Sequence, residues 1–236
     1  MKVAILSDVH SNIYALEEVI KDIKNRKCDF ILCLGDYIGY YYWPNEVIDL
    51  LRSMKHTFFI RGNHEDIYFN SLQDSSFRKN ILDKYGSGND YSISEITMEN
   101  RTFLQSLDDS KIIVLDGIKI AMYHGSPIDI NDYVYPDSDF TKHQTLIDDD
   151  IALVLLGHTH HQFISCKGST LIVNPGSVGQ ARDVRGLASY AVFDTLNKTV
   201  IPVRLSYKHD LIINKINKVE KLRAKALVSS ISGVIQ

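Results

Sequence analysis

Short apolar runs alternate with segments of helical periodicity in the first third of the chain. The runs "KVAILSD", "DFILCLGD" and "TFFIRGN" are rich in β-branched and aromatic residues, which is typical of buried strands. Between the first two, "NIYALEEVIKDIKN" repeats apolar residues at helical spacing after Asn12, a good N-cap residue. Between the last two, "PNEVIDLLRSM" begins with Pro44, which suits the first turn of a helix. This βαβαβ order predicts parallel strands with helices packed against them.

Residues 65–110 are more polar and have a helical pattern. Ser92 and Glu95 stand at capping-box spacing ahead of an apolar stripe, which predicts a helix that begins near residue 92. We therefore expect a helical excursion over 65–110, inserted between strands of the sheet. The spacing does not decide whether this excursion is a lid or covers a sheet edge.

Strands dominate from residue 112 onward. The run "IIVLDGIKIAMYHG" predicts a hairpin with Asp116 and Gly117 as its two-residue turn, and "IALVLLGH" predicts a buried strand. Two further hairpins are predicted in "FISCKGSTLIV" and "SYAVFDTLNKTVIPVRL". Two packed sheets with helices outside them would accommodate this order.

The tail has the pattern of one helix over about 209–233. Its apolar stripe consists of Ile212, Ile216, Val219 and Leu222. This stripe could pack against the body of the protein, which we favour, or form a homodimer contact. We find no repeat and no linker, so we expect residues 1–236 to form a single domain.

Composition and charge exclude several classes of protein. The chain has 236 residues, of which 44% are hydrophobic and 23% charged, and no apolar run long enough to span a membrane. The apolar stretch at the amino terminus is too short for a signal peptide, so we expect a cytoplasmic protein. A net charge of −3 with dispersed lysines makes nucleic acid an unlikely partner. Cys28, Cys33 and Cys166 are odd in number and lack CxxC spacing, which predicts buried free thiols.

Metal-ligating side chains follow the ends of five predicted strands. Because the carboxyl ends of parallel strands share one rim, these residues are expected to converge. Three oxygen donors and four imidazoles exceed the ligand set of one zinc ion and fit two ions that share Asp36. Mixed oxygen and nitrogen donors without thiolate favour Mn, Fe, Co, Ni or Zn. The seven predicted ligands are Asp8, His10, Asp36, Asn63, His124, His158 and His160.

Five motifs carry a resemblance to a known family. They are DVH (8–10), GDYIG (35–39), GNHE (62–65), HG (124–125) and GHTH (157–160), in this order. The chain resembles the calcineurin-like metallophosphoesterase superfamily. The later runs "NPGSVGQAR" and "GLASYAVFD" are similar to its small bacterial and archaeal phosphodiesterase branch, which includes diadenosine-tetraphosphate hydrolases. The sequence lacks the GDxxDRG motif of protein phosphatases, because Gly39 and Tyr40 follow the aspartate loop.

The resemblance implies a fold and a set of roles. The fold is an α/β sandwich of two mixed β-sheets flanked by helices, in four layers. One metal is assigned to Asp8, His10, Asp36 and His160, and the other to Asp36, Asn63, His124 and His158. His64 remains unliganded beside the metals, as the catalytic acid or the stabiliser of the leaving group. His161 is expected to point away from the site, since alternate side chains of an extended segment face opposite sides.

These roles predict a dinuclear phosphoesterase, with Mn favoured as the metal. Two ions about 4 Å apart can lower the pKa of a shared water to near neutrality, so that hydroxide attacks the phosphorus in line. We expect a phosphodiesterase that acts on small phosphodiesters or nucleotides. The alternatives are a metal-binding scaffold without catalysis, or a phosphomonoesterase or protein phosphatase.

Candidate substrate contacts are less defined. The stretch "DYIGYYYWPNE" collects tyrosines beside Asp36, and rings such as Tyr37 and Tyr41 could stack a nucleobase or belong to packing or a dimer surface. Asn12 and Arg182 complete the set of predicted substrate contacts, Arg182 because it could hold a remote phosphate.

Overall fold

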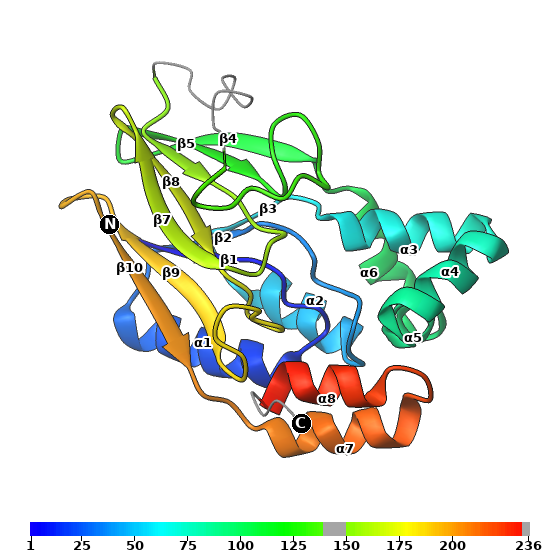
Figure 1. The fold of residues 1–236 in the computed structure, drawn as a ribbon. Coiled ribbons are helices and arrows are strands. Elements are labelled where there is room, and N and C mark those ends of the chain that lie inside the picture. Colours follow the sequence, from blue (N-terminus) through cyan, green and yellow to red (C-terminus); the bar gives the residue numbers. More distant parts are fainter. Residues whose placement is uncertain (139–149, 233–236) are drawn as a thin grey trace.

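The computed structural model describes residues 1–138 and 150–232, which contain two five-stranded mixed sheets and eight helices (Figure 1). In the first sheet the parallel pairs lie on one side and the antiparallel pairs on the other, whereas the second sheet has parallel pairs in its centre and an antiparallel pair at each edge. The first sheet consists of β10 (Thr199–Leu205), β9 (Ala188–Asp194), β1 (Lys2–Leu6), β2 (Phe30–Cys33) and β3 (Thr57–Phe59), in spatial order. The second consists of β4 (Ser110–Leu115), β5 (Ile118–Tyr123), β6 (Leu153–Leu155), β8 (Thr170–Pro175) and β7 (Gln162–Lys167). The expected α/β sandwich of two mixed sheets is confirmed.

Strand β1 shows how the sequence builds the layers. Successive side chains of a strand point to opposite faces, so a strand that is buried on both sides is apolar throughout. Ala4 and Leu6 belong to the core between the first sheet and its helices, whereas Val3 and Ile5 belong to the core between the two sheets. This double burial explains the continuous apolar run in the sequence.

Two helices cover the outer face of the first sheet (Figure 1). They are α1 (Ile13–Arg26) and α2 (Pro44–Ser53), which begin at the predicted positions. The Asn12 side chain accepts a hydrogen bond from the backbone of Ala15 and caps α1. The predicted β4–β5 turn is also confirmed, with Asp116 and Gly117 both at positive φ, as a two-residue turn of type I′ requires.

The predicted excursion consists of four helices. They are α3 (Asn63–Gln73), α4 (Ser75–Tyr85), α5 (Gly88–Glu95) and α6 (Met98–Gln105). The predicted helix start at Ser92 is wrong, because Ser92 lies inside α5 and its hydroxyl donates to the Gly88 carbonyl. Thr97 caps α6 instead by accepting from the Asn100 amide. Helices α5 and α6 contact α2, so the excursion packs beside the first sheet and its helices.

The single predicted tail helix is wrong. The chain forms α7 (His209–Val219) and α8 (Ala224–Ser232), with position 233 outside the described residues. The break follows from Glu220, whose carboxylate accepts from the amides of Leu222 and Arg223 and so turns the chain. Leu222 is exposed as a result. The apolar faces of both helices pack on the protein body, in one cluster with Tyr41 and Tyr42.

Two other expectations concern cysteines and membranes. Cys33 is buried and Cys28 half-buried, but Cys166 is exposed on β7, so burial of all three thiols was wrongly expected. In the described ranges 1–138 and 150–232, no helix has the length and apolar character needed to cross a bilayer.

Candidate metal centre

The loops after the strands of both sheets meet at one rim, and backbone hydrogen bonds hold them together. The Asp8 amide donates to the Gly35 carbonyl, and the His10 amide donates to the Asp36 carbonyl. Across the two sheets, the amide of Gly179 donates to the carbonyl of Asp8. The polar side chains of these loops are therefore placed by backbone contacts between segments far apart in sequence.

The seven predicted ligands are all buried and form two groups that share Asp36. The first group contains Asp8, His10, Asp36 and His160; the second contains Asp36, His124 and His158, and Asn63 lies beside it. The Oδ2 atom of Asp36 lies 3.7 Å from His10 Nε2 and 3.3 Å from His124 Nε2, between the groups. Its Oδ1 atom accepts from the His64 amide at 2.8 Å, which fixes the carboxylate. This geometry leaves Oδ2 available to both groups.

Three imidazoles are oriented by backbone carbonyls. The Nδ1 atoms of His10, His124 and His160 lie 2.7–3.1 Å from the carbonyl oxygens of Ile38, Leu34 and Gln180, respectively. A carbonyl oxygen only accepts, so Nδ1 carries a proton and Nε2 is the ring nitrogen that faces the centre.

The two groups fit divalent cations. The Nε2 atoms of His10 and His160 are only 3.0 Å apart, and two facing lone pairs repel unless a proton or a metal ion lies between them. The Oδ1 atom of Asp8 is buried without a hydrogen-bond partner among the described residues. Buried nitrogen and oxygen donors that converge without partners are the arrangement that a metal ion satisfies.

The electrostatics also favour positive charge at the centre. Burial alone would lower the pKa of His124, but the carboxylates of Asp36 and Asp8 outweigh it and raise this pKa to about 10. Burial would raise the pKa of Asp36, yet the neighbouring imidazoles of His124 and His64 hold it well below its usual range. Two buried carboxylates thus draw cationic charge toward themselves.

Backbone strain coincides with the two groups. Asp8, His10, Asp36, His158 and His160 have φ between 51° and 63°, the left-handed region that non-glycine residues rarely adopt. Each such residue costs on the order of 1–3 kcal/mol and persists only where its surroundings hold it. The GHTH segment is therefore a sequence of bends, and the strand-like alternation expected for it is wrong. His161 nevertheless lies outside both groups, with its Nδ1 atom 2.8 Å from the Thr159 carbonyl oxygen.

Glu65 is a structural support that the sequence reasoning did not single out. Its buried carboxylate accepts from the amides of Asp36 and Gly62 through Oε2, and from the amide of Tyr37 through Oε1. It thereby ties the GDYIG loop to the GNHE loop. Burial and the charge of Asp36 raise the pKa of Glu65 to about 8, and positive charge beside Asp36 would relieve this repulsion. The sequence signal that could have identified Glu65 is its place as the fourth residue of the GNHE motif.

His64 lies beside the two groups at the start of α3. Its ring centre is 4.6 Å from that of His10 and 5.1 Å from that of Tyr40. A Cβ atom at Gly39, which has a φ of 99°, would collide with His64 Nδ1, so glycine is required there. Burial lowers the pKa of His64 to about 4, although the Asp36 carboxylate opposes this shift.

Three of the four residues predicted to contact substrate are buried, with their polar atoms hydrogen-bonded inside the protein. Tyr37 is in the core, and its hydroxyl donates to the carbonyls of Cys33 and Ile60. Tyr41 is fully buried, with its hydroxyl 3.2 Å from Ser230 Oγ. The Asn12 amide caps α1 and donates to the Gly179 carbonyl. For the two tyrosines this favours packing among the alternatives left open by the sequence, and the polar atoms of all three residues are paired inside the protein.

Arg182 lies at the site, together with three tyrosines from different segments. Its guanidinium donates to the Tyr40 hydroxyl, and the Tyr40 ring packs 4.7 Å from His10. Tyr85, from the end of α4, places its ring centre 5.4 Å from that of His64. Beside His158, the ring centre of the half-exposed Tyr133 lies 4.3 Å from the ring centre of His158.

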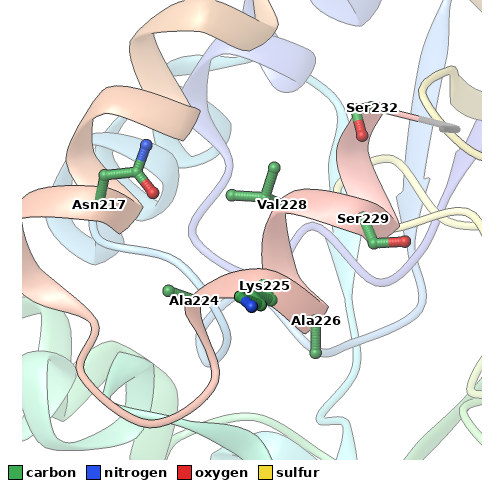
Figure 2. A pocket seen from close by; sticks show the side chains of 7 residues that line it. All are labelled: Asn217, Ala224, Lys225, Ala226, Val228, Ser229 and Ser232. Carbon is green, nitrogen blue, oxygen red and sulfur yellow. The ribbon is translucent and has the colours of Figure 1, made fainter. Parts of the chain in front are cut away.

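One cavity of the molecule is not lined by any of these residues. A cavity of about 500 Å³ lies between α7 and α8 (Figure 2). Its lining includes Asn217, Lys225 and Val228, and none of its lining side chains belongs to the two groups.

Comparison with known proteins agrees with the fold and the motifs. Residues 1–198 match the calcineurin-like phosphoesterase superfamily domain. An uncharacterized protein of Methanocaldococcus jannaschii is 33% identical over 226 residues, which cover 87% of each chain. The crystal structure of a metallophosphoesterase from Sphaerobacter thermophilus has a TM-score of 0.78 and 26% identity, covering 99% of this chain and 100% of that one. A hypothetical protein of Pyrococcus horikoshii has a TM-score of 0.81 and 20% identity, with 96% and 97% covered.

The two-sheet sandwich with metal-ligating residues at one rim defines a metal-dependent hydrolase of phosphoric esters. The chain belongs to the calcineurin-like phosphoesterase superfamily, which depends on divalent metals. The resemblance found in its five motifs is thereby confirmed.

Proposed function

We propose that this protein is a dinuclear phosphodiesterase that acts on small phosphodiesters or nucleotides, and that residues 1–236 form one such domain. The observation that carries the proposal is the pair of buried donor groups that share Asp36 Oδ2. An intact set of seven donors with His64 beside it supports an enzyme over a scaffold.

The proposed ligand sets follow the two groups. Asp8, His10, Asp36 and His160 would hold one ion. Asp36, Asn63, His124 and His158 would hold the other. Two divalent ions, with Mn favoured, supply an acidified water and positive charge for the phosphate oxygens when they are bound.

We assign His64 to the leaving group. The imidazole lies at the edge of the two donor groups, where it reaches an ester oxygen that departs from the phosphorus. Approach of an anionic phosphate favours the protonated imidazole, which offsets part of the effect of burial on the pKa of His64. The proton then stays on the departing alkoxide.

Arg182 is the remaining candidate for substrate contact. Its bond to the Tyr40 hydroxyl holds the guanidinium beside the donor groups, where it can bind phosphate oxygens.

We also propose that the protein is located in the cytoplasm.

The experiment that tests the function measures hydrolysis of bis(p-nitrophenyl) phosphate and p-nitrophenyl phosphate. Metal-stripped protein is assayed with and without added Mn²⁺, beside His158→Ala and its neighbour variant His161→Ala. We expect Mn-dependent cleavage of the diester, lost in His158→Ala and kept in His161→Ala, since His161 is outside both groups. Two bound metals without cleavage of either ester would favour the scaffold alternative.

A further inference from the structure

A second cavity, of about 360 Å³, adjoins the His64 side of the candidate metal centre. It is built by segments far apart in sequence: the loop that contains Tyr40, the end of α4, the loop that contains Gln180, and α8 with the turn before it. Its lining includes Tyr40, Lys84, Tyr85, Gln180, Arg223 and Ser230.

Two aromatic rings join this cavity to the centre. Tyr40 and Tyr85 line the cavity, and their ring centres lie 5.1 Å and 5.4 Å from that of His64. Gln180 lines it as well, and the Gln180 carbonyl is the acceptor that orients His160. The cavity therefore shares its Tyr40 and Tyr85 walls with the surroundings of His64.

The cavity is lined by cationic side chains. Lys84 and Arg223 form no ion pair with any described residue, and Arg182 stands next to the lining residue Tyr40. The Lys84 ammonium lies 4.7 Å from the Tyr85 ring centre, which keeps it on the cavity wall. None of the described lining residues is acidic.

The groove on the His124 side of the centre has no lysine or arginine among its described lining residues. This groove of about 310 Å³ is lined by Asp66, Asp109 and Asp129, and the first two carboxylates are paired with Arg61. An anionic group attached to the substrate therefore finds lysine and arginine side chains in the described lining of the His64 side only. The two sides thus specify the direction in which a charged substrate lies.

We propose that the cavity on the His64 side binds a second, terminal phosphate of the substrate, between Lys84 and Arg223. The inference rests on the proposed phosphodiesterase function and specifies its substrate class, which is a phosphodiester whose attached group carries a further phosphate. Guanidinium and ammonium groups without carboxylate partners suit a phosphate dianion. Tyr85, Gln180 and Ser230 line the same space, and the Gln180 amide and the Ser230 hydroxyl are hydrogen-bonded to each other and to Tyr41.

The test compares two esters that differ only in the second phosphate. One is the p-nitrophenyl ester of thymidine 5′-phosphate, and the other is the same ester with a 3′-phosphate. We expect the Mn-loaded wild type to have a kcat/KM about tenfold higher for the phosphorylated ester. Arg223→Ala and Lys84→Ala should each lower this ratio toward one. Lys225 lies on α8 and lines the other cavity (Figure 2). Lys225→Ala therefore removes one positive charge outside the proposed phosphate site, and this variant should keep the wild-type ratio.

Each other outcome has a distinct meaning. Equal kcat/KM for the two esters in wild type, or a preference that survives both Arg223→Ala and Lys84→Ala, would overturn the inference. Cleavage of bis(p-nitrophenyl) phosphate but of neither thymidine ester would overturn it too and leave the phosphodiesterase standing. Failure to cleave any of the three diesters would refute the phosphodiesterase, and this inference with it.

Discussion

The strand-end loops and the helical wall beside them are built in different ways. The loops hold their side chains through backbone contacts: Nδ1 of His10 and of His160 faces a carbonyl, and both residues have positive φ. The wall consists of Tyr40, the end of α4, and α8 with the turn before it, and it presents the exposed side chains of Lys84 and Arg223, which have no ion pair to a described residue. The loops are therefore suited to fixed metal geometry, and the wall is suited to choosing among substrates.

This difference predicts two kinds of mutational effect. Changes in the loops should remove metal or the chemical step for every phosphoester. Changes in the wall and its neighbours should alter binding of particular substrates and leave metal content intact.

Asp36→Asn should have the largest effect. The substitution removes the charge of the one side chain that both donor groups share. We expect bound metal to fall below two ions per chain and kcat/KM to fall by at least about 10³-fold, since metal stabilisation amounts to several kcal/mol. Metal content is measured by elemental analysis. Asp29→Asn makes the same charge change at an exposed residue directly before β2. This variant should retain both the metal content and the activity of the wild type. Full metal content and activity in Asp36→Asn would refute the shared-ligand arrangement.

His64→Ala should separate chemistry from metal binding within the loops. We expect two bound metals and a kcat lowered by about 10²- to 10⁴-fold for an alkyl ester. The loss should be smaller for p-nitrophenyl esters, because nitrophenolate departs without a proton. A His64→Ala protein as active as wild type on both kinds of ester would exclude a role for His64 in the reaction.

Glu65→Gln tests the backbone support of the loops. An amide group placed among the donating amides of Asp36, Gly62 and Tyr37 cannot accept all of their hydrogen bonds. We expect metal affinity to fall by about 10- to 100-fold and the free energy of unfolding by about 1–3 kcal/mol. Titration with Mn²⁺ and urea denaturation measure the two. Glu99→Gln, at an exposed carboxylate on α6, should change neither, and equal values for the two variants would contradict the supporting role.

The same difference explains what the sequence could predict. The seven donors follow strand ends, so their convergence is dictated by local patterns and one topological rule. The wall combines Tyr40, Tyr85 and Arg223, which no spacing connects, and only long-range packing brings them together. Burial also decides among identical residues: Tyr37 pairs with core carbonyls, whereas Tyr40, three residues later, reaches His10. The break at Glu220 was hidden for a similar reason, since its carboxylate also accepts from Ser87, 133 residues earlier.

Arg182→Ala should have the smallest effect and locate the boundary between the two regions. The Arg182 backbone amide donates to the His160 carbonyl, but its side chain reaches Tyr40 on the wall. If the side chain binds substrate, KM for bis(p-nitrophenyl) phosphate should rise by about three- to tenfold, with kcat and metal content close to wild type. Arg185→Ala removes an exposed guanidinium three residues away and serves as the matched control. A fall in kcat with lost metal would instead assign Arg182 to the support of His160, because a wall residue has no reason to disturb the metal.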